Sequence, residues 1–233
     1  MSLAPEIKAF LEAGAAAGLP QVWEAPVEVI RKNTQARPAL AGPVEAVHEM
    51  INQYIPGPTA DLPIRIYRPT VATNAPAIVY FHGGGWVLNF LDIYDASLAR
   101  LANQSGATII SVNYQKAPEH PFPIPFDDCY ATLLWVIANA GNLGIDKNRI
   151  GVAGDSAGAN LASGVAIKAR DNSVALAFQV LIYPCNDRNF ETNSYKENAT
   201  GYGLSMQAMQ WFWDQYLQGS HHDQNPYAIP MRA

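Results

Sequence analysis

The segment Gly154-Asp155-Ser156-Ala157-Gly158 is the most informative part of this sequence for predicting its fold. It follows Arg149 to Ala153, which has the pattern of a buried strand, and it leads into Ala159 to Arg170, which has the pattern of a helix. A serine placed between a strand and a helix lies on a sharp turn, where flanking glycines prevent collisions between neighbouring side chains. We therefore interpret the pentapeptide as a nucleophile elbow, with Ser156 as the nucleophile.

A second motif, His82-Gly83-Gly84-Gly85-Trp86, follows the apolar run Ala77 to Phe81. A backbone without Cβ can bring its N–H close to a substrate oxygen, and the residue after a nucleophile supplies another such donor. The pattern predicts an oxyanion hole formed by Gly83, Gly84 and Ala157, in which each donor contributes roughly 3 kcal/mol of transition-state stabilisation. A tight turn after a strand is the simpler alternative, and the elbow downstream favours the functional interpretation.

The two motifs, with the segment Tyr114 to Pro121 between them, resemble the hormone-sensitive-lipase-like family of α/β-hydrolase esterases. Ala4 to Leu11, Pro63 to Pro69 and Leu181 to Pro184 are also similar to that family, so the resemblance covers nearly the whole chain. It implies an α/β-hydrolase fold, in which helices flank a mostly parallel sheet and an N-terminal helical segment caps the active site. It also implies a serine carboxylesterase that acts through an acyl-enzyme on short to medium acyl esters without a cofactor.

The resemblance has one large departure. Members of the family continue through two further strands, which carry the triad Asp in an Asp-Pro-Leu-like turn and the triad His in a His-Gly-Phe-like turn, and this sequence contains neither turn. We therefore expect a core without the last two strands and a weak or inactive site, because an unassisted serine is a poor nucleophile. A non-catalytic ligand-binding homologue is the alternative, a non-functional fragment is a third possibility, and a thioesterase or amidase could share the same residues.

The remaining polar residues offer no replacement for the triad. His82 is expected to bond loop backbone, and Asp155 is interpreted as an orienting or loop-bonding carboxylate. His48 and His120 are poor base candidates. His221-His222 is interpreted as an exposed loop whose adjacent side chains diverge, so no metal site is expected, and the less favoured alternative is that one of these two histidines reaches Ser156.

Composition excludes several classes. A net charge of −5 over 233 residues, without a basic block, argues against nucleic acid. No apolar run approaches the ~20 residues of a membrane span. Charged residues at Glu6, Lys8 and Glu12 argue against a signal peptide, so a cytoplasmic location is expected. Cys129 and Cys185 suggest free core thiols rather than a disulfide framework.

Two regions are expected, a cap segment over residues 1–44 and a hydrolase core over residues 45–233. Helices are predicted in the cap near residues 7–14 and 26–35. These helices either cover the active site or form a pair that packs against the core. In the core, Glu45 to Ile55 and Leu62 to Arg68 predict a hairpin. Short apolar runs predict parallel strands at Ala77 to Phe81, Thr108 to Tyr114, Arg149 to Ala153 and Phe178 to Tyr183, with helices between them at about residues 93–105, 126–140 and 157–169.

Ser205 is a plausible N-cap for a last helix, Met206 to Tyr216, whose aromatic residues either line a pocket or form the buried face of an amphipathic helix. Trp86 could likewise shape a pocket or hold its loop in place. The run Phe178 to Tyr183 is expected to be a long apolar sheet edge, which invites homo-oligomer formation or other strand-edge association.

Overall fold

The computed structural model describes residues 3–35, 41–71, 73–219 and 221–233. Its centre is a six-stranded sheet in the order β1-β2-β4-β3-β5-β6. β1 pairs antiparallel with β2, and β2 antiparallel with β4, whereas β4, β3, β5 and β6 run parallel. The strands are β1 (Glu49–Ile55), β2 (Leu62–Arg68), β3 (Ala75–Phe81), β4 (Thr108–Val112), β5 (Ile145–Asp155) and β6 (Gln179–Ile182).

Strand β3 shows why this sheet needs helices on both faces. Its alternate residues Ala77, Val79 and Phe81 belong to one hydrophobic core, and Ile78 and Tyr80 belong to another. Successive side chains of a strand point to opposite faces, so a strand that is apolar throughout must be covered on both sides. The continuous apolar runs in the sequence are thereby explained.

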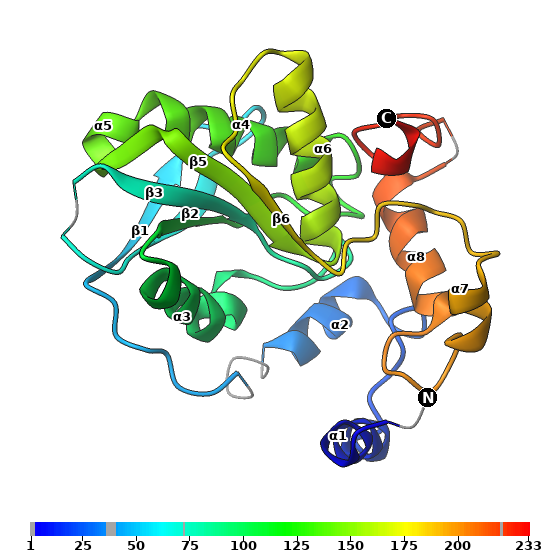
Figure 1. Cartoon of the computed structure of the whole chain (residues 1–233). Helices are drawn as coiled ribbons and strands as arrows, with labels where there is room; N and C mark the ends of the chain where they lie inside the picture. Colours follow the sequence, from blue (N-terminus) through cyan, green and yellow to red (C-terminus); the bar gives the residue numbers. More distant parts are fainter. Residues whose placement is uncertain (1–2, 36–40, 72, 220) are drawn as a thin grey trace.

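Helices provide that cover (Figure 1). α3 contributes to the smaller core on one face, and α4 and α6 pack against each other within the larger core on the other face. Each follows a strand of the parallel sheet, as crossover helices do. The helices of the chain are α1 (Pro5–Ala16), α2 (Val27–Thr34), η2 (Leu91–Tyr94), α3 (Asp95–Ser105), α4 (Ile124–Ala138), α5 (Ala140–Leu143), α6 (Ala157–Asp171), α7 (Asn193–Glu197), α8 (Met206–Leu217) and η3 (Pro230–Arg232).

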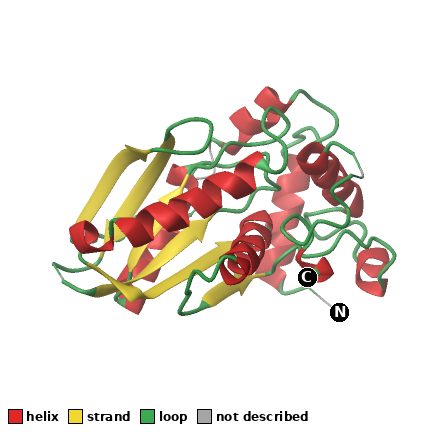
Figure 2. Ribbon diagram, turned by 90° about the horizontal axis from the view of Figure 1, so that it is seen from above, coloured by secondary structure: helices red, strands yellow, loops and turns green. Residues whose placement is uncertain are grey.

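The N-terminal helices differ in how they contact the core. α2 buries Ile30 and Thr34, whereas α1 has no buried residue and exposes 51% of Ile7 and 65% of Phe10. Helical spacing therefore identified α1 correctly without identifying a buried face. Figure 1 shows α1 and α8 away from the β1–β2 hairpin, and Figure 2 shows that the two ends of the chain lie on the same side of the molecule. The division into residues 1–44 and 45–233 stays a prediction.

The edge strand β6 is shorter than the sequence indicated. It spans four residues rather than Phe178 to Tyr183, although it does lie at the edge of the sheet beside β5. Val180 is 45% exposed and Tyr183 73% exposed. The expectation of a long edge is corrected, and association through this edge stays a prediction.

The predicted hairpin and parallel strands are present, with bounds shifted by a few residues. The Ser205 hydroxyl accepts a hydrogen bond from the Ala208 N–H and caps α8, as expected. Neither α5 nor α7 was predicted, because helices of four or five residues are too short to show a periodic pattern. Across the described residues, no helix has both the length and the apolar character needed to span a membrane.

Candidate active site

The elbow has the geometry that its glycines require. Ser156 lies between β5 and α6 with φ of 53°, a value that a residue with a side chain rarely adopts. A Cβ at Gly154 would collide with the backbone of Gly158, and a Cβ at Gly158 would collide with the carbonyl of Phe81. The Ser156 N–H donates to the carbonyl of Ile182 at 2.9 Å, which ties the turn to the end of β6. The strained turn expected at Ser156 is thus present.

Asp155 binds the glycine loop, as the sequence suggested. Its Oδ1 accepts hydrogen bonds of 2.9 Å from the Tyr80 hydroxyl and the Gly83 N–H, and its Oδ2 accepts one of 2.9 Å from the Tyr94 hydroxyl. Burial raises the pKa of Asp155, and the hydrogen bonds from Tyr94, Tyr80 and Gly83 oppose that rise. The carboxylate next to the nucleophile therefore holds the loop in place.

This arrangement bears on the predicted oxyanion donors. The Gly83 N–H donates to both Asp155 and the Tyr94 oxygen, so this amide is hydrogen-bonded within the protein. The N–H groups of Gly84 and Gly85 have no hydrogen-bond acceptor in the part of the chain that the structure describes. The sequence did not single out Gly85, because a run of three glycines does not show which amides the fold leaves unbonded.

His82 is part of the core and not a base. Its side chain is fully buried, its ring stacks on Tyr114 with centroids 4.4 Å apart, and its Nδ1 lies 2.8 Å from the Gly83 carbonyl oxygen. Burial and the charge of Lys116 lower the pKa of His82 to about 3. An imidazole with so low a pKa is a weak base, which agrees with the structural role expected for it.

The other histidines do not complete the site either. Over the described residues, no hydrogen bond joins the side chain of any histidine to Ser156. His221 and His222 lie in a turn with ring centroids 3.9 Å apart, so the expectation that they diverge is wrong, because a turn brings adjacent side chains together where an extended loop separates them. No group of three or more metal-ligating side chains occurs within the described segments.

Both cysteines are free, as expected. Cys185 interacts with the side chain of Ser156, and burial raises the pKa of its thiol to about 12. The thiol is therefore protonated at neutral pH and cannot take the proton of the serine hydroxyl.

Helix α8 fixes the end of the glycine loop. Trp86 is fully buried and lies parallel to Tyr216 with centroids 4.3 Å apart, while Trp213 lies 4.5 Å away. The Phe212 ring fills the space that a Cβ at Gly85 would occupy. The aromatic residues of α8 form a buried face, and Trp86 holds the loop in place.

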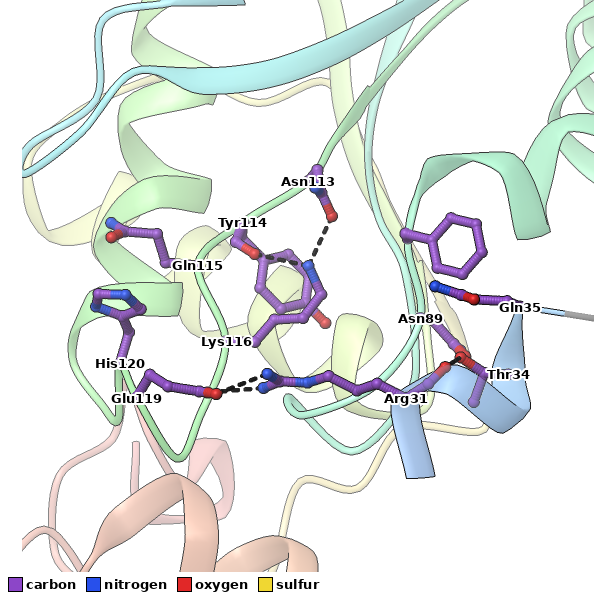
Figure 3. Close-up of a pocket in the computed structure, with 11 residues that line it drawn as sticks. Arg31, Thr34, Gln35, Asn89, Asn113, Tyr114, Gln115, Lys116, Glu119 and His120 are labelled. Carbon is purple, nitrogen blue, oxygen red and sulfur yellow. Dashed lines mark hydrogen bonds and ion pairs between the residues drawn. The ribbon is translucent and has the colours of Figure 1, made fainter. Parts of the chain in front are cut away.

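A cavity of about 510 Å³ is lined in part by Asn89 and Phe90, which follow the glycine loop in the chain (Figure 3). Residues of α2 line one wall, and the segment from Asn113 to His120, which follows β4, lines another. None of Ser156, Gly83, Gly84, Gly85 and Ala157 belongs to its lining.

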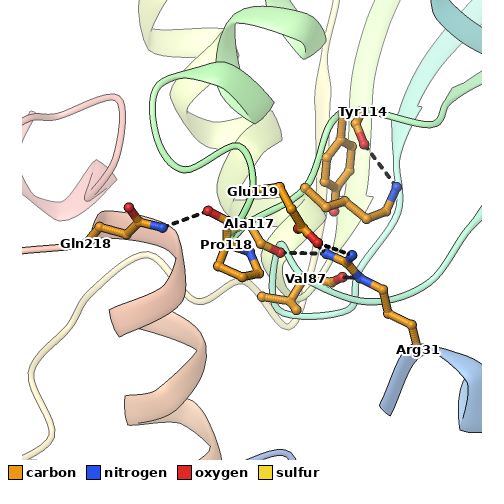
Figure 4. Close-up of polar contacts among 8 residues, drawn as sticks. Arg31, Val87, Tyr114, Ala117, Pro118, Glu119 and Gln218 are labelled. Atoms are coloured by element: carbon orange, nitrogen blue, oxygen red, sulfur yellow. Dashed lines mark hydrogen bonds and ion pairs between the residues drawn. The ribbon is translucent and has the colours of Figure 1, made fainter. Parts of the chain in front are cut away.

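Arg31 of α2 joins the N-terminal segment to the loops of the core (Figure 4). Its Nη1 and Nη2 each donate to a Glu119 carboxylate oxygen at 2.7 Å, its Nη2 donates to the Ala117 carbonyl at 2.8 Å, and its Nε donates to the Val87 carbonyl at 2.9 Å. The Ala117 N–H in turn donates to the Trp86 carbonyl at 3.1 Å. Arg31 therefore braces the end of the glycine loop, a role that no sequence pattern distinguished from that of the neighbouring Lys32.

Comparison with known proteins extends this description. A family model described as the alpha/beta hydrolase fold matches residues 78–233. An esterase structure from the hyperthermophilic archaeon Pyrobaculum calidifontis superposes with a TM-score of 0.92 at 36% identity, and the match covers all of this chain and 76% of that one. The fold class predicted from sequence is confirmed.

Two relatives known by sequence carry hydrolase names. The chain is 36% identical over 206 residues to an arylesterase of Saccharolobus solfataricus, a match that covers 88% of this chain and 67% of the relative. It is 43% identical over 161 residues to the carboxylesterase NlhH of Mycobacterium tuberculosis, covering 68% of this chain and 50% of that protein. The chain thus spans about two thirds and one half of the lengths of these two relatives.

Proposed function

This chain belongs to the α/β-hydrolase fold family, and from that premise we propose that it is a serine carboxylic-ester hydrolase acting on short to medium acyl esters. The observation that carries the proposal is the strained Ser156 elbow, which Asp155 ties to a glycine loop that has unbonded amides. The esterase names of the relatives support the reaction class.

Ser156 is the proposed nucleophile. Its Oγ attacks the ester carbonyl, the alcohol leaves with a proton, and water then releases the acid from the acyl-serine. Both steps place negative charge on the former carbonyl oxygen, which backbone N–H groups stabilise. We assign this role to Ala157 and Gly84, as the sequence indicated, and to Gly85 in place of Gly83, because the Gly83 amide already donates to Asp155.

The proton of Ser156 needs a base, and none of the five histidines is hydrogen-bonded to this serine in the described structure. We therefore propose that the 233-residue chain by itself is a weak esterase. With only oxyanion donors and substrate positioning, a serine hydrolase retains roughly 10³ to 10⁴-fold acceleration over water. The same observation supports a non-catalytic ligand-binding homologue as the second candidate.

Hydrolysis of p-nitrophenyl acetate and butyrate tests the proposal. We expect slow release of nitrophenol by the 233-residue chain, and faster release by a fusion that adds the C-terminal segment of an esterase relative. Ser156→Ala in the fusion should abolish the gain, whereas Ser163→Ala, a hydroxyl of α6 that bonds the Ala159 carbonyl, should retain it.

Two outcomes would contradict this proposal. Ordinary enzymatic rates from the 233-residue chain would show that it contains a base, and His221→Ala and His222→Ala would be the first variants to examine. A fusion that folds and binds an ester but never turns it over would favour the ligand-binding alternative.

A further inference from the structure

The cavity beside α2 has the size of a small-molecule site. Its volume of about 510 Å³ falls within the range of roughly 300 to 1,000 Å³ that such sites occupy. Figure 3 shows Thr34 and Gln35 on the α2 side and Asn113 and Lys116 on the opposite side. The proposed catalytic residues do not line it, so an occupant would be distinct from an ester bound at Ser156.

Lys116 is the unusual group in this cavity. Its Nζ donates to the Asn113 Oδ1 at 2.6 Å and to the Tyr114 carbonyl at 2.9 Å, and both acceptors are neutral. No carboxylate in the described structure lies within ion-pair distance of this ammonium. Two acceptors leave the third ammonium proton available. The ammonium also lies 5.2 Å from the centroid of the Tyr114 ring, so its partners are two neutral acceptors and an aromatic face, and it has no carboxylate counter-ion.

The other cation of the cavity is already neutralised. Arg31 forms a bidentate ion pair with Glu119, and two further N–H groups of its guanidinium donate hydrogen bonds to backbone carbonyls. The remaining lining is largely uncharged and includes Gln35, Asn89 and the ring of Phe90. When Lys116 is protonated, the cavity thus has one positive charge without a carboxylate partner, among hydrogen-bonding amides and aromatic surface.

The surroundings of Lys116 make its charge costly. Burial is the main cause that lowers its pKa to about 7, and the nearby charge of Arg31 acts in the same direction. Cys129, Asp128 and Glu119 act in the opposite direction without restoring the ordinary value. The charge of Lys116 also contributes to the lowered pKa of His82, which lies on the loop after β3. An anion in the cavity would relieve this cost.

We propose that this cavity binds a small organic monocarboxylate, whose carboxylate accepts a hydrogen bond from the Lys116 ammonium. A single uncompensated cation matches one negative charge, and a phosphate dianion would leave charge unpaired in a partly buried site. The amides of Gln35 and Asn89 can bond polar substituents, and Phe90 can pack against an apolar part. This binding is independent of turnover at Ser156.

Calorimetric titration of the 233-residue chain with benzoate, butyrate and lactate tests the proposal, with benzamide, butyramide and lactamide as neutral controls and inorganic phosphate as a dianion. We expect the carboxylates to bind, and we expect the amides and phosphate to bind at least about tenfold more weakly. A tenfold difference corresponds to the loss of one charge-assisted hydrogen bond. Lys116→Met should weaken carboxylate binding by a similar factor. Lys168→Met, which removes a lysine over the rings of Phe126, Tyr130 and Tyr227, should leave it unchanged.

A second measurement keeps the proposal falsifiable if Lys116→Met fails to fold. The Lys116 ammonium can be followed by NMR in the unaltered chain, and saturating benzoate should shift its titration to higher pH. Equal affinity for benzoate and benzamide, retention of binding by folded Lys116→Met, or a Lys116 titration that benzoate does not move would each overturn the proposal. Tighter binding of phosphate than of the carboxylates would overturn the choice of ligand class.

Discussion

The glycine loop with its elbow and the cavity around Lys116 are held in place by different kinds of contact. In the first, positions are set by close backbone contact: Gly158 packs under the Phe81 carbonyl, and Gly83 bonds Asp155. In the second, side-chain charges from distant segments meet, with Arg31 reaching from α2 to Glu119. A steric clash with the backbone cannot be relieved by any other group, whereas a charge can be compensated by a neighbouring residue, a ligand or water.

The largest expected difference between the two regions concerns Gly158. Gly158→Ala places a methyl group against the Phe81 carbonyl, where neither backbone can move without breaking the sheet, so we expect a loss of at least about 3 kcal/mol of unfolding free energy. Gly141→Ala is the matched control, because in the short helix α5 nothing lies within 4 Å of the position that the added methyl group would occupy. Urea denaturation should show the control within about 1 kcal/mol of the original chain. Equal stabilities would contradict the steric account.

Lys116 should produce a pH effect that the elbow does not. The pKa of Lys116 is lowered from 10.5 to about 7 by folding, so between those values the unfolded chain binds more protons than the folded chain. Stability attributable to this group therefore rises with pH above about 7, by at most about 1.4 kcal/mol per pH unit. Lys116→Met should remove that rise when denaturation midpoints are measured from pH 7 to pH 9. An unchanged pH slope would contradict the burial of the charged group.

Arg31 connects the two regions and should have an intermediate effect. Arg31→Ala leaves the Val87 and Ala117 carbonyls without their donor, and we expect a loss of about 1 to 3 kcal/mol. Arg100→Ala is the control, because Arg100 is 56% exposed and pairs with the exposed Glu45, and its loss should stay below about 1 kcal/mol.

Hydrogen exchange would distinguish a local effect of Arg31 on the glycine loop from an effect on the stability of the whole chain. Faster exchange at the Val87 and Leu88 amides, both bonded to the Gly84 carbonyl, is expected in Arg31→Ala and not in Arg100→Ala. Uniformly faster exchange throughout the chain would contradict a specific brace on the glycine loop.

The smallest stability effect is expected at the sheet edge, outside both regions. Val180 is 45% exposed on β6, so Val180→Lys should change unfolding free energy by about 0.5 kcal/mol or less. A charge on an exposed edge opposes strand pairing between molecules. Light scattering at high concentration should therefore show less self-association in the variant. A monodisperse monomer before substitution would contradict association through this edge.

Prediction from the sequence succeeded where the chemical nature of a residue restricts the local structure that it can adopt. Glycines around Ser156 predicted the turn, and the unbroken apolar run of β3 predicted cover on both faces. The sequence did not indicate that the Gly83 amide bonds an aspartate 72 positions away, and it was wrong about His221 and His222, which a turn brings together. In both cases the contact depends on how the chain folds, and the types of the residues involved do not predict that.

Short stretches of sequence are enough to predict the elbow, the parallel sheet and the crossover helices, because backbone sterics and hydrophobic periodicity are local properties. Three features become visible only in the folded chain: the amides of the glycine loop that have no acceptor, the brace that Arg31 provides for this loop, and the cavity in which Lys116 lies without a counter-ion. These features arise from contacts between segments up to 88 positions apart. A side chain's partners, and therefore its charge and its hydrogen bonds, are fixed only when the fold brings such segments together.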